Sequence, residues 1–125
     1  MINQGKILIV EDDLLTQKAL EFRLKKDGYT VVKASDGLKA KELLISENPD
    51  LLITDLMIPF VSGLELIEFA KNQLKKAIPV IVLSAANQEK IILDSFNLGA
   101  DDFMSKPFSP LEVTVRVKRL LAKNG

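Results

Sequence analysis

The sequence contains neither cysteine nor histidine, and these two absences narrow the chemistry that it can perform. Without cysteine there is no disulfide framework, no thiol nucleophile and no thiolate metal site. Without histidine there is no imidazole for acid–base catalysis near neutral pH or for a zinc site. Any chemistry must therefore come from carboxylates, lysines, hydroxyls or a bound hard cation.

An excess of charge of either sign is also missing, because 17 Lys and Arg residues balance 17 Asp and Glu residues. The chain thus lacks the positive field typical of proteins that bind nucleic acid or an anionic membrane. No apolar run approaches the length of a membrane span, and the segment before Ile7 is too short and polar for a signal peptide. We therefore expect a soluble, cytoplasmic protein without direct nucleic-acid or membrane contact.

The 125 residues suffice for one domain with a real core, and we expect a single domain over residues 1–125. Short apolar runs alternate with segments of helical periodicity. The expected strands are 6–10, 29–34, 51–53, 78–83 and 102–105, and the expected helices are 14–26, 37–44, 64–74, 88–98 and 110–121. This alternation predicts an α/β fold with a five-stranded parallel sheet and helices on both faces. By analogy with known doubly wound sheets, we expect the flavodoxin-like strand order 2-1-3-4-5.

Two helical segments carry apolar positions of particular interest. Within 88–98, Ile92 and Phe96 are expected to face the core. Within 14–26, one apolar stripe consists of Leu15, Ala19 and Phe22. Leu20 and Leu24 lie beside this stripe.

The chain is organised around residues 49–59, where an apolar strand is followed at once by Asp55. A continuous apolar run indicates a strand buried on both faces of a parallel sheet. Ligands of such sheets bind beyond the carboxyl ends of the strands, so Asp55 stands where a functional acid is expected. An aspartate at a strand exit is also a common turn residue, and Asp55 taken alone leaves both interpretations open.

Three adjacent carboxylates follow the first strand, and their mutual repulsion calls for an explanation. Asp13 is expected to cap the helix that begins at Leu14, since a helix N-terminus favours negative charge. For Glu11 and Asp12, a cation site is the sharper interpretation. Oxygen ligands without nitrogen or sulfur suit Mg²⁺ or Mn²⁺.

Two further polar side chains follow the remaining strands of the expected active edge. Ser84 follows the fourth strand and offers a hydroxyl, whereas Lys106 follows the fifth and offers a positive charge for a phosphoryl oxygen. Either residue alone is more often an ordinary surface or strand-end side chain. Together with three carboxylates at one sheet edge, they indicate phosphoryl transfer to a carboxylate, which needs no general base.

These residues make the chain resemble a response-regulator receiver domain of two-component signalling, the chemotaxis-receiver-like fold. The resemblance runs from about Lys6 to Leu121 and is specific only as a combination. The matching stretches are residues 7–13, 55–59 with Gly63, 84–85, 99–103 and 106–108.

The resemblance implies a phosphoacceptor rather than an enzyme that turns over a separate substrate. Asp55 would accept phosphate from a sensor histidine kinase or a His-phosphotransfer domain. Mg²⁺ would be held by Asp12, Asp55 and the backbone carbonyl of Met57, with Glu11 acting through water. Ser84 and Lys106 would bind the phosphoryl group, and the Lys106–Pro107 peptide bond would be cis.

A switch is implied in the same way. Phosphate on Asp55 would draw in Ser84, and Phe103 would move into the vacated space, changing the helix 4–strand 5–helix 5 face. Phe103 lacks the hydroxyl of the tyrosine frequent at this position, which favours an inward rotamer. A phosphorylation-dependent homodimer through helices 4 and 5 is a further hypothesis, with Arg116 paired across it to Asp101 or Asp102. Ile91-Ile92, however, stand where a basic partner for Glu112 is expected.

Departures and alternatives complete the interpretation. Phe60 stands where a small residue is usual, so it is expected to project near the site and gate access. A flavodoxin-like module that binds flavin mononucleotide is one alternative, but it requires a glycine-rich phosphate loop where this chain has residues 11–13. An aspartate phosphatase is another, but it requires a second acid at the position of Met57. A degenerate receiver, used only as a phosphorylation-independent interaction module, is the remaining alternative. The chain is either a stand-alone receiver or part of a longer regulator.

Overall fold

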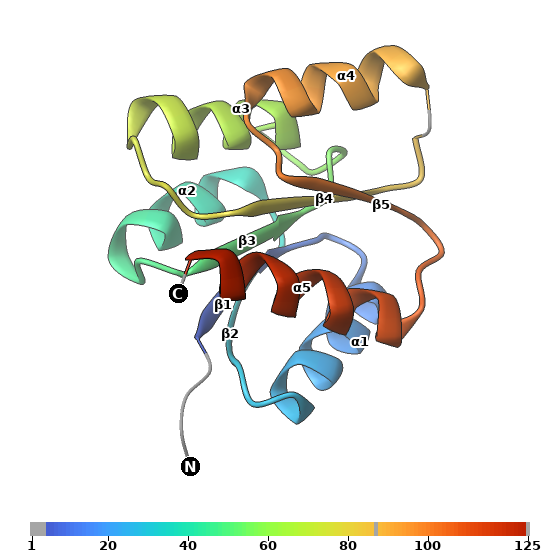
Figure 1. Ribbon diagram of the computed structural model, residues 1–125. Coiled ribbons are helices and arrows are strands. Elements are labelled where there is room, and N and C mark those ends of the chain that lie inside the picture. Colours follow the sequence, from blue (N-terminus) through green and yellow to red (C-terminus); the bar gives the residue numbers. More distant parts are fainter. Residues whose placement is uncertain (1–4, 87, 125) are drawn as a thin grey trace.

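The computed structural model describes residues 5–86 and 88–124, in which strands and helices alternate along the chain (Figure 1). The strands are β1 (Lys6–Val10), β2 (Thr30–Ala34), β3 (Leu51–Thr54), β4 (Val80–Ser84) and β5 (Asp102–Ser105). The helices are α1 (Leu14–Lys26), α2 (Gly37–Ser46), α3 (Gly63–Glu68), α4 (Glu89–Leu98) and α5 (Pro110–Asn124), with a π-helical turn η1 (Phe69–Gln73) directly after α3.

All five strands are parallel and pair in the order β2-β1-β3-β4-β5, which confirms the predicted topology. Val10, the last residue of β1, lies in register with Ala34 of β2 and with Thr54 of β3. On the other side of β3, Ser84 of β4 lies in register with Ser105 of β5. The carboxyl ends of the strands therefore meet at one edge of the sheet, and the residues that follow them share that edge.

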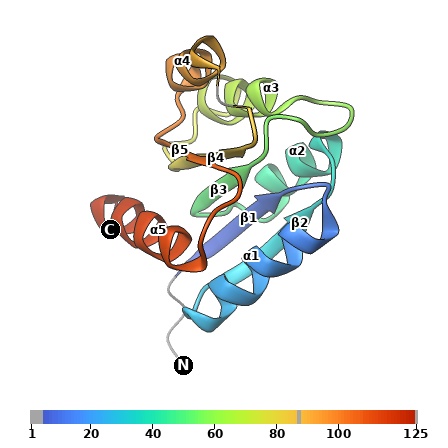
Figure 2. The same cartoon turned by 90° about the vertical axis from the view of Figure 1, so that its right-hand side faces the viewer.

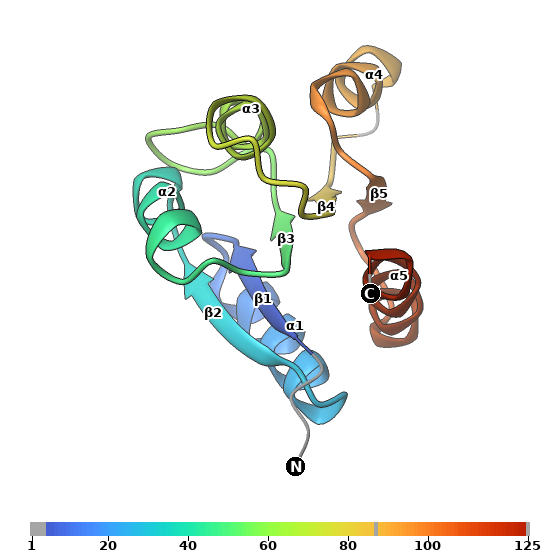
Figure 3. The same ribbon diagram turned by 60° about the vertical axis from the view of Figure 1, so that its left-hand side comes forward.

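Helices cover both faces of the sheet, with α1 and α5 on one face and α2, α3 and α4 on the other (Figures 2 and 3). Successive side chains of a strand point to opposite faces, so each inner strand contributes to two separate apolar cores. The core beneath α1 and α5 includes Ile7, Ile9, Ile53, Ile81 and Leu83. The core beneath the other three helices includes Leu8, Val10, Leu52, Val80 and Val82.

The buried face of α1 is not its most apolar stripe. Leu20 and Leu24 are fully buried and share their face with Gln17, at spacings of three and four residues. Leu15 and Phe22 are instead 80% and 70% exposed. The stripe that contains them therefore leaves an apolar surface on the solvent side of α1.

The prediction for α4 is wrong at Phe96, which is 42% exposed. Ile91 rather than Ile92 packs against the core, together with Leu98. The fully buried residue of α4 is Ser95, whose hydroxyl donates to the carbonyl of Ile92 at 2.8 Å. The polar side chain can be buried because its hydrogen bond is satisfied within the helix.

The third helix ends differently from the expected continuous helix over 64–74. After Glu68 the hydrogen-bonding pattern widens, and the N–H of Leu74 donates to the carbonyl of Phe69, five residues earlier, at 2.8 Å. A π-helical turn of this kind accommodates one extra residue in a helix. Lys75 follows with a φ of 53°, which ends the helical segment before β4.

The ends of the sheet and of its helices follow the expected rules. The edge strand β2 exposes Thr30 and Lys33, as its interleaved polar residues indicate. Asp13 caps α1 by accepting the N–H of Thr16 at 3.4 Å, and Gly28 follows the helix with a φ of 98°.

Within residues 5–86 and 88–124, the helices are too short or too polar to span a membrane.

Candidate functional site

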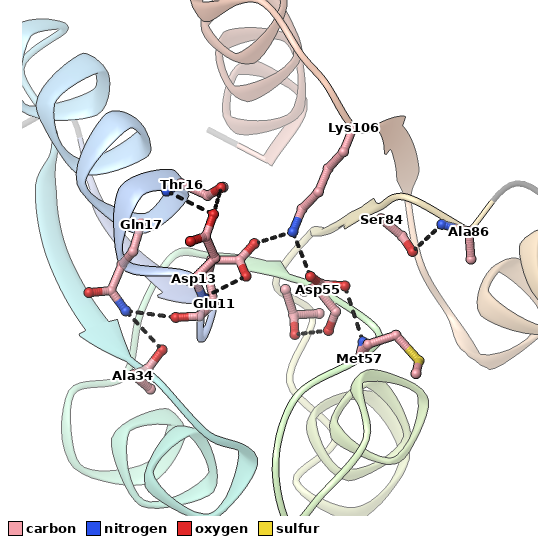
Figure 4. Close-up of polar contacts among 11 residues, drawn as sticks. Glu11, Asp13, Thr16, Gln17, Ala34, Asp55, Met57, Ser84, Ala86 and Lys106 are labelled. Carbon is pink, nitrogen blue, oxygen red and sulfur yellow. Dashed lines mark hydrogen bonds and ion pairs between the residues drawn. The ribbon is translucent and has the colours of Figure 1, made fainter.

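The candidate site lies at the carboxyl edge of the sheet, where the ends of β1, β3, β4 and β5 come together (Figure 4). The loop after β1 brings Glu11 and the loop after β3 brings Asp55. Ser84 ends β4, and Lys106 extends from the loop after β5 toward both carboxylates. The sequence prediction that these residues gather at one edge is therefore confirmed in space.

Lys106 is the cation of this cluster. Its Nζ lies 2.7 Å from Oδ2 of Asp55 and 2.6 Å from Oε1 of Glu11. Burial lowers the pKa of Lys106, but its bonds to Asp55 and Glu11 outweigh this effect and hold the pKa above the ordinary 10.5. Lys106 is therefore charged at neutral pH and offsets part of the repulsion between two carboxylates.

Glu11 is almost completely buried, which is unusual for a carboxylate. Its Oε2 accepts the N–H of Asp13 at 3.1 Å, whereas its buried Oε1 has an ion-pair contact with Lys106 but no hydrogen bond of good geometry. Burial raises the pKa of Glu11 above the ordinary 4.5, although Lys106 and the N–H of Asp13 act in the opposite direction. A buried oxygen in this state is well suited to meet a cation or the water that a cation carries.

Asp12 completes a group of three carboxylates. One oxygen each of Glu11, Asp12 and Asp55 lies within 4.8 Å of the others, and Asp12 is exposed to solvent. Three carboxylates with no nitrogen or sulfur donor among them form a donor set that fits a hard divalent cation. The side chains predicted from sequence to ligate a metal are thus close enough to act together.

Residues before and after Asp55 in the chain hold its backbone and its carboxylate in place. The N–H of Met57 donates to Oδ1 of Asp55 at 3.1 Å, and the hydroxyl of Thr54 donates to the Asp55 carbonyl at 2.8 Å. A Cβ atom on Gly63 would lie 2.4 Å from that same carbonyl oxygen, so only glycine fits there. Asp55 therefore has a constrained backbone as well as a constrained carboxylate.

The same loop contains a strained residue. Phe60 has a φ of 71°, and the N–H of Val61 donates to the carbonyl of Pro59 at 2.8 Å, which makes Phe60 the centre of a γ-turn. Positive φ is uncommon for a bulky residue and is held only where its surroundings demand it. Here the N–H of Gly37 also donates to the Pro59 carbonyl, and the Phe60 side chain is 78% exposed.

Ser84 and Phe103 occupy the positions at which a switch is predicted. The Ser84 side chain is buried, and its Oγ accepts the N–H of Ala86 at 3.0 Å. Phe103, beside Val82 in the sheet, is half-buried and packs against the core beneath α2, α3 and α4. The Lys106–Pro107 bond is cis, as expected, and the N–H of Lys106 donates to the Ser84 carbonyl at 2.9 Å.

Sequence reasoning missed two polar side chains beside the site. Thr54 holds the Asp55 peptide as described above, and Gln17 of α1 reaches the carbonyl of Glu11 at 2.9 Å. Gln17 is separated from Leu20 and Leu24 by three and seven residues, and this spacing is the signal that could have placed it on the buried face.

A groove of about 470 Å³ adjoins the cluster and joins α1 to the loop before α5. Its polar lining includes Lys106 and Arg23. Its apolar lining includes Leu15, Ala19, Pro107 and Phe108. The solvent-facing stripe of α1 and the candidate site are thus parts of one continuous surface.

A flavodoxin-like sheet with three clustered carboxylates and an ion-paired lysine at its carboxyl edge defines a class, the receiver domains of response regulators. The family model of the response regulator receiver domain matches residues 7–118, and the chain belongs to this family.

Known relatives agree with this assignment. The chain is 40% identical over 119 residues to the alkaline phosphatase synthesis transcriptional regulatory protein PhoP of Bacillus subtilis, covering 95% of this chain and 49% of PhoP. A putative response regulator from Chloroflexus aurantiacus has a TM-score of 0.88 at 34% identity, over 94% of this chain and 98% of that one. A CheY-like receiver domain protein from Methanospirillum hungatei has a TM-score of 0.90 at 27% identity, over 94% of both chains. The chain spans about half the length of the curated relatives that it matches.

Proposed function

We propose that this receiver domain accepts a phosphoryl group on Asp55 from a phosphohistidine of a sensor histidine kinase or a His-phosphotransfer domain. The contact of 2.7 Å between Lys106 Nζ and Asp55 Oδ2 carries this proposal. It puts a positive charge where the negative charge of an incoming phosphoryl group must be balanced. The domain is then a signalling element that changes its own covalent state rather than an enzyme acting on a separate substrate.

The carboxylates beside Asp55 fit a divalent cation, Mg²⁺ or Mn²⁺. Glu11, Asp12 and Asp55 would hold it, together with the backbone carbonyl of Met57, and the close approach of the three carboxylates supports this assignment. When bound, the ion neutralises charge on the transferred phosphoryl group.

In the transfer step, an oxygen of the Asp55 carboxylate attacks the phosphorus while the bond from phosphorus to the histidine nitrogen breaks. The leaving imidazole keeps the electron pair of that bond, and an acyl phosphate forms on Asp55. No general base is needed, because the carboxylate is the nucleophile in its ionised form. The Met57 N–H orients the Asp55 carboxylate, and Lys106 Nζ contacts the new phosphoryl oxygens.

Ser84 and Phe103 would carry the response. Because Ser84 Oγ accepts the Ala86 N–H, its own proton remains available for a phosphoryl oxygen. A movement of Ser84 toward Asp55 leaves space that the half-buried ring of Phe103 can fill. The face formed by α4, β5 and α5 then changes its preference for a downstream partner. Phe103 rotamer populations measured by NMR with and without phosphate test this step, and identical populations contradict it.

The donor is proposed to dock on the surface that joins α1 to the loop before α5. Leu15 and Phe108 offer apolar contact there, and the groove reaches Lys106 beside Asp55. Phe22 is exposed on the same helix, α1. A helical donor carrying a phosphohistidine can bury its apolar side on this surface while its imidazole faces Asp55. We propose a cytoplasmic location, since the relative PhoP is named as a transcriptional regulatory protein.

A phosphorylation-dependent dimer through α4 and α5 remains a proposal. Leu93 and Phe96 of α4 and Val115 of α5 are exposed and supply apolar surface for it. The basic partner proposed for it, Arg116, already pairs within the chain with Asp102 and with Glu112 at 3.1 Å. If Arg116 is to pair across the dimer, its pairs within the chain must open. Sedimentation of the protein with and without the phosphoryl mimic beryllofluoride tests whether the dimer forms. A monomer in both states contradicts the dimer.

Intact-mass spectrometry after incubation with acetyl phosphate tests the central proposal. The wild type is compared with and without Mg²⁺, beside Asp55→Asn. We expect one phosphoryl adduct that requires Mg²⁺ and is lost in the variant. An adduct that survives in Asp55→Asn means that another carboxylate is the acceptor. No adduct on the wild type favours a phosphorylation-independent interaction module.

A further inference from the structure

Gln17 is a buried polar side chain that ties together three parts of the chain near the acidic cluster. Its residue is 5% exposed, and it lies on the inner face of α1 between that helix and the ends of β1 and β2. Its Nε2 lies 2.9 Å from the carbonyl of Glu11 and 3.3 Å from the carbonyl of Ala34 (Figure 4). It also lies 3.3 Å from Oγ of Ser35.

The hydrogen bond to Glu11 acts on the turn that carries two of the three clustered carboxylates. The peptide group between Glu11 and Asp12 includes that carbonyl, so its position fixes where the Asp12 side chain begins. The N–H of Glu11 is held as well, because it donates to the Ala34 carbonyl at 3.0 Å. Both backbone polar groups of Glu11 are therefore held, the carbonyl by Gln17 and the N–H by Ala34.

The rigidity of this turn matters more for Mg²⁺ than for most other cations. Mg²⁺ demands near-ideal octahedral geometry at short ligand distances, whereas Ca²⁺ tolerates variable ligand number and distance. Groups that orient metal ligands without touching the metal typically change its affinity by 10- to 100-fold when removed. A residue that only fills the core would affect stability without changing the balance between two cations.

We propose that Gln17 is a positioning residue that holds the Glu11–Asp12 turn in a geometry selective for Mg²⁺ over larger cations. This inference rests on the proposed Mg²⁺ site and adds a residue to it that touches neither the ion nor the phosphoryl group.

Gln17→Met tests the proposal, because methionine has nearly the same length and lacks the amide donor. Binding of MgCl₂ and of CaCl₂ to the unphosphorylated protein is measured by isothermal titration calorimetry. We expect the Mg²⁺ dissociation constant to rise about tenfold and the Ca²⁺ constant to rise less than about threefold. A loss of selectivity of this kind does not follow from reduced stability alone.

Thr114→Val is the matched control. Thr114 is also buried, and its hydroxyl donates to Asp27 at the opposite end of α1 at 2.6 Å. The substitution removes a buried hydrogen bond to the α1 end far from the turn, so we expect a lower unfolding temperature with both dissociation constants unchanged. Thermal unfolding without metal shows how much stability each variant has lost.

An NMR measurement on the wild type makes the test independent of any variant at Gln17. The Nε2 protons of Gln17 are expected to shift during Mg²⁺ titration and to stay unshifted in Asp12→Asn. Equal weakening of Mg²⁺ and Ca²⁺ in Gln17→Met, unchanged constants, or unshifted wild-type resonances at saturating Mg²⁺ would each overturn the role of Gln17. A wild type that binds no Mg²⁺ would overturn the proposed metal site as well, so the two failures are distinguishable.

Discussion

Lys106 and Asp55 are 51 positions apart in the chain, yet Nζ of one lies 2.7 Å from Oδ2 of the other. The contact forms because β3 and β5 flank β4 and all three end at the same edge of the sheet. Lys106 thereby provides a positive charge beside the carboxylates of Asp55 and Glu11, the same role that a divalent cation would play. This competition between an internal and an external cation leads to the first prediction.

Lys106→Met is expected to tighten Mg²⁺ binding and to slow phosphorylation. Removing the internal cation leaves the carboxylates to the metal, and an interaction of about 1 kcal/mol corresponds to roughly a fivefold lower dissociation constant. Labelling by acetyl phosphate is expected to slow by about 10²-fold or more, as for loss of one charge-stabilising donor. Calorimetry and mass spectrometry measure the two effects. Lys90→Met, at a solvent-exposed pair with Asp94, is the control and should change neither.

The stability contributed by Lys106 is expected to disappear at alkaline pH. Its pKa in the folded protein lies above the ordinary 10.5 because Asp55 and Glu11 hold the charged form despite burial. A raised lysine pKa stabilises the fold at pH values below 10.5, and this contribution is lost as the pH rises through the folded-state value. Urea unfolding of the wild type and of Lys106→Met in EDTA should therefore differ most near neutral pH. A difference that grows above pH 10.5 contradicts this assignment.

Gly63→Ala is expected to destabilise the fold by about 2–3 kcal/mol. The added Cβ would lie 2.4 Å from the Asp55 carbonyl oxygen and 2.6 Å from Cα of Leu56, and neither backbone atom can move without shifting the acid. Denaturant unfolding measures the loss, and acetyl phosphate labelling should slow as well. The neighbouring Ser62→Ala removes the α3 cap, which accepts the Glu65 N–H at 3.2 Å, and should cost only about 1 kcal/mol with labelling unchanged.

Phe60→Gly and Phe60→Ala separate backbone strain from any gating by the ring. Glycine relieves the penalty of a φ of 71°, which is about 1–2 kcal/mol. Part of this gain in stability is lost because glycine has greater conformational freedom in the unfolded chain. We expect a net gain of about 0.5–1 kcal/mol for glycine and little change for alanine, since the ring is mostly exposed. If the ring gates the site, both variants should be labelled faster by acetyl phosphate. Equal rates in all three proteins exclude the gate.

The topology and the meeting of Asp55, Glu11 and Lys106 could be predicted because they depend on strand order alone. Once the apolar runs are accepted as parallel strands, the residues after them must share an edge. The details that failed depend on how helices lie on the sheet. The helical spacing of Ile92 and Phe96 predicts that both face the core, whereas the orientation of α4 buries Ser95 and turns Phe96 outward.

Gln17 and the π-helical turn illustrate the same limit. The apolar spacing of α1 leaves open which of two neighbouring faces is buried, and the helix buries Leu20 and Leu24 while Leu15 and Phe22 stay exposed. Gln17 is tolerated inside because backbone carbonyls at the ends of β1 and β2 satisfy its amide. Such partners are brought together only by the tertiary fold. The π-helical turn at Phe69–Gln73 likewise has no signal in the local sequence pattern.

The two glycine contacts around the β3–α3 loop have a consequence for how such a domain can diversify. A Cβ on Gly37 would lie 2.3 Å from the carbonyl oxygen of Val61, and one on Gly63 would strike the Asp55 carbonyl oxygen, so the path of this loop is fixed at both ends. Between these points, Met57 and Phe60 are 76% and 78% exposed. Mutation can therefore alter the side chains that border the acid while its backbone stays in place. Reaction rates and partner choice can drift in evolution at these two positions without the fold having to be rebuilt.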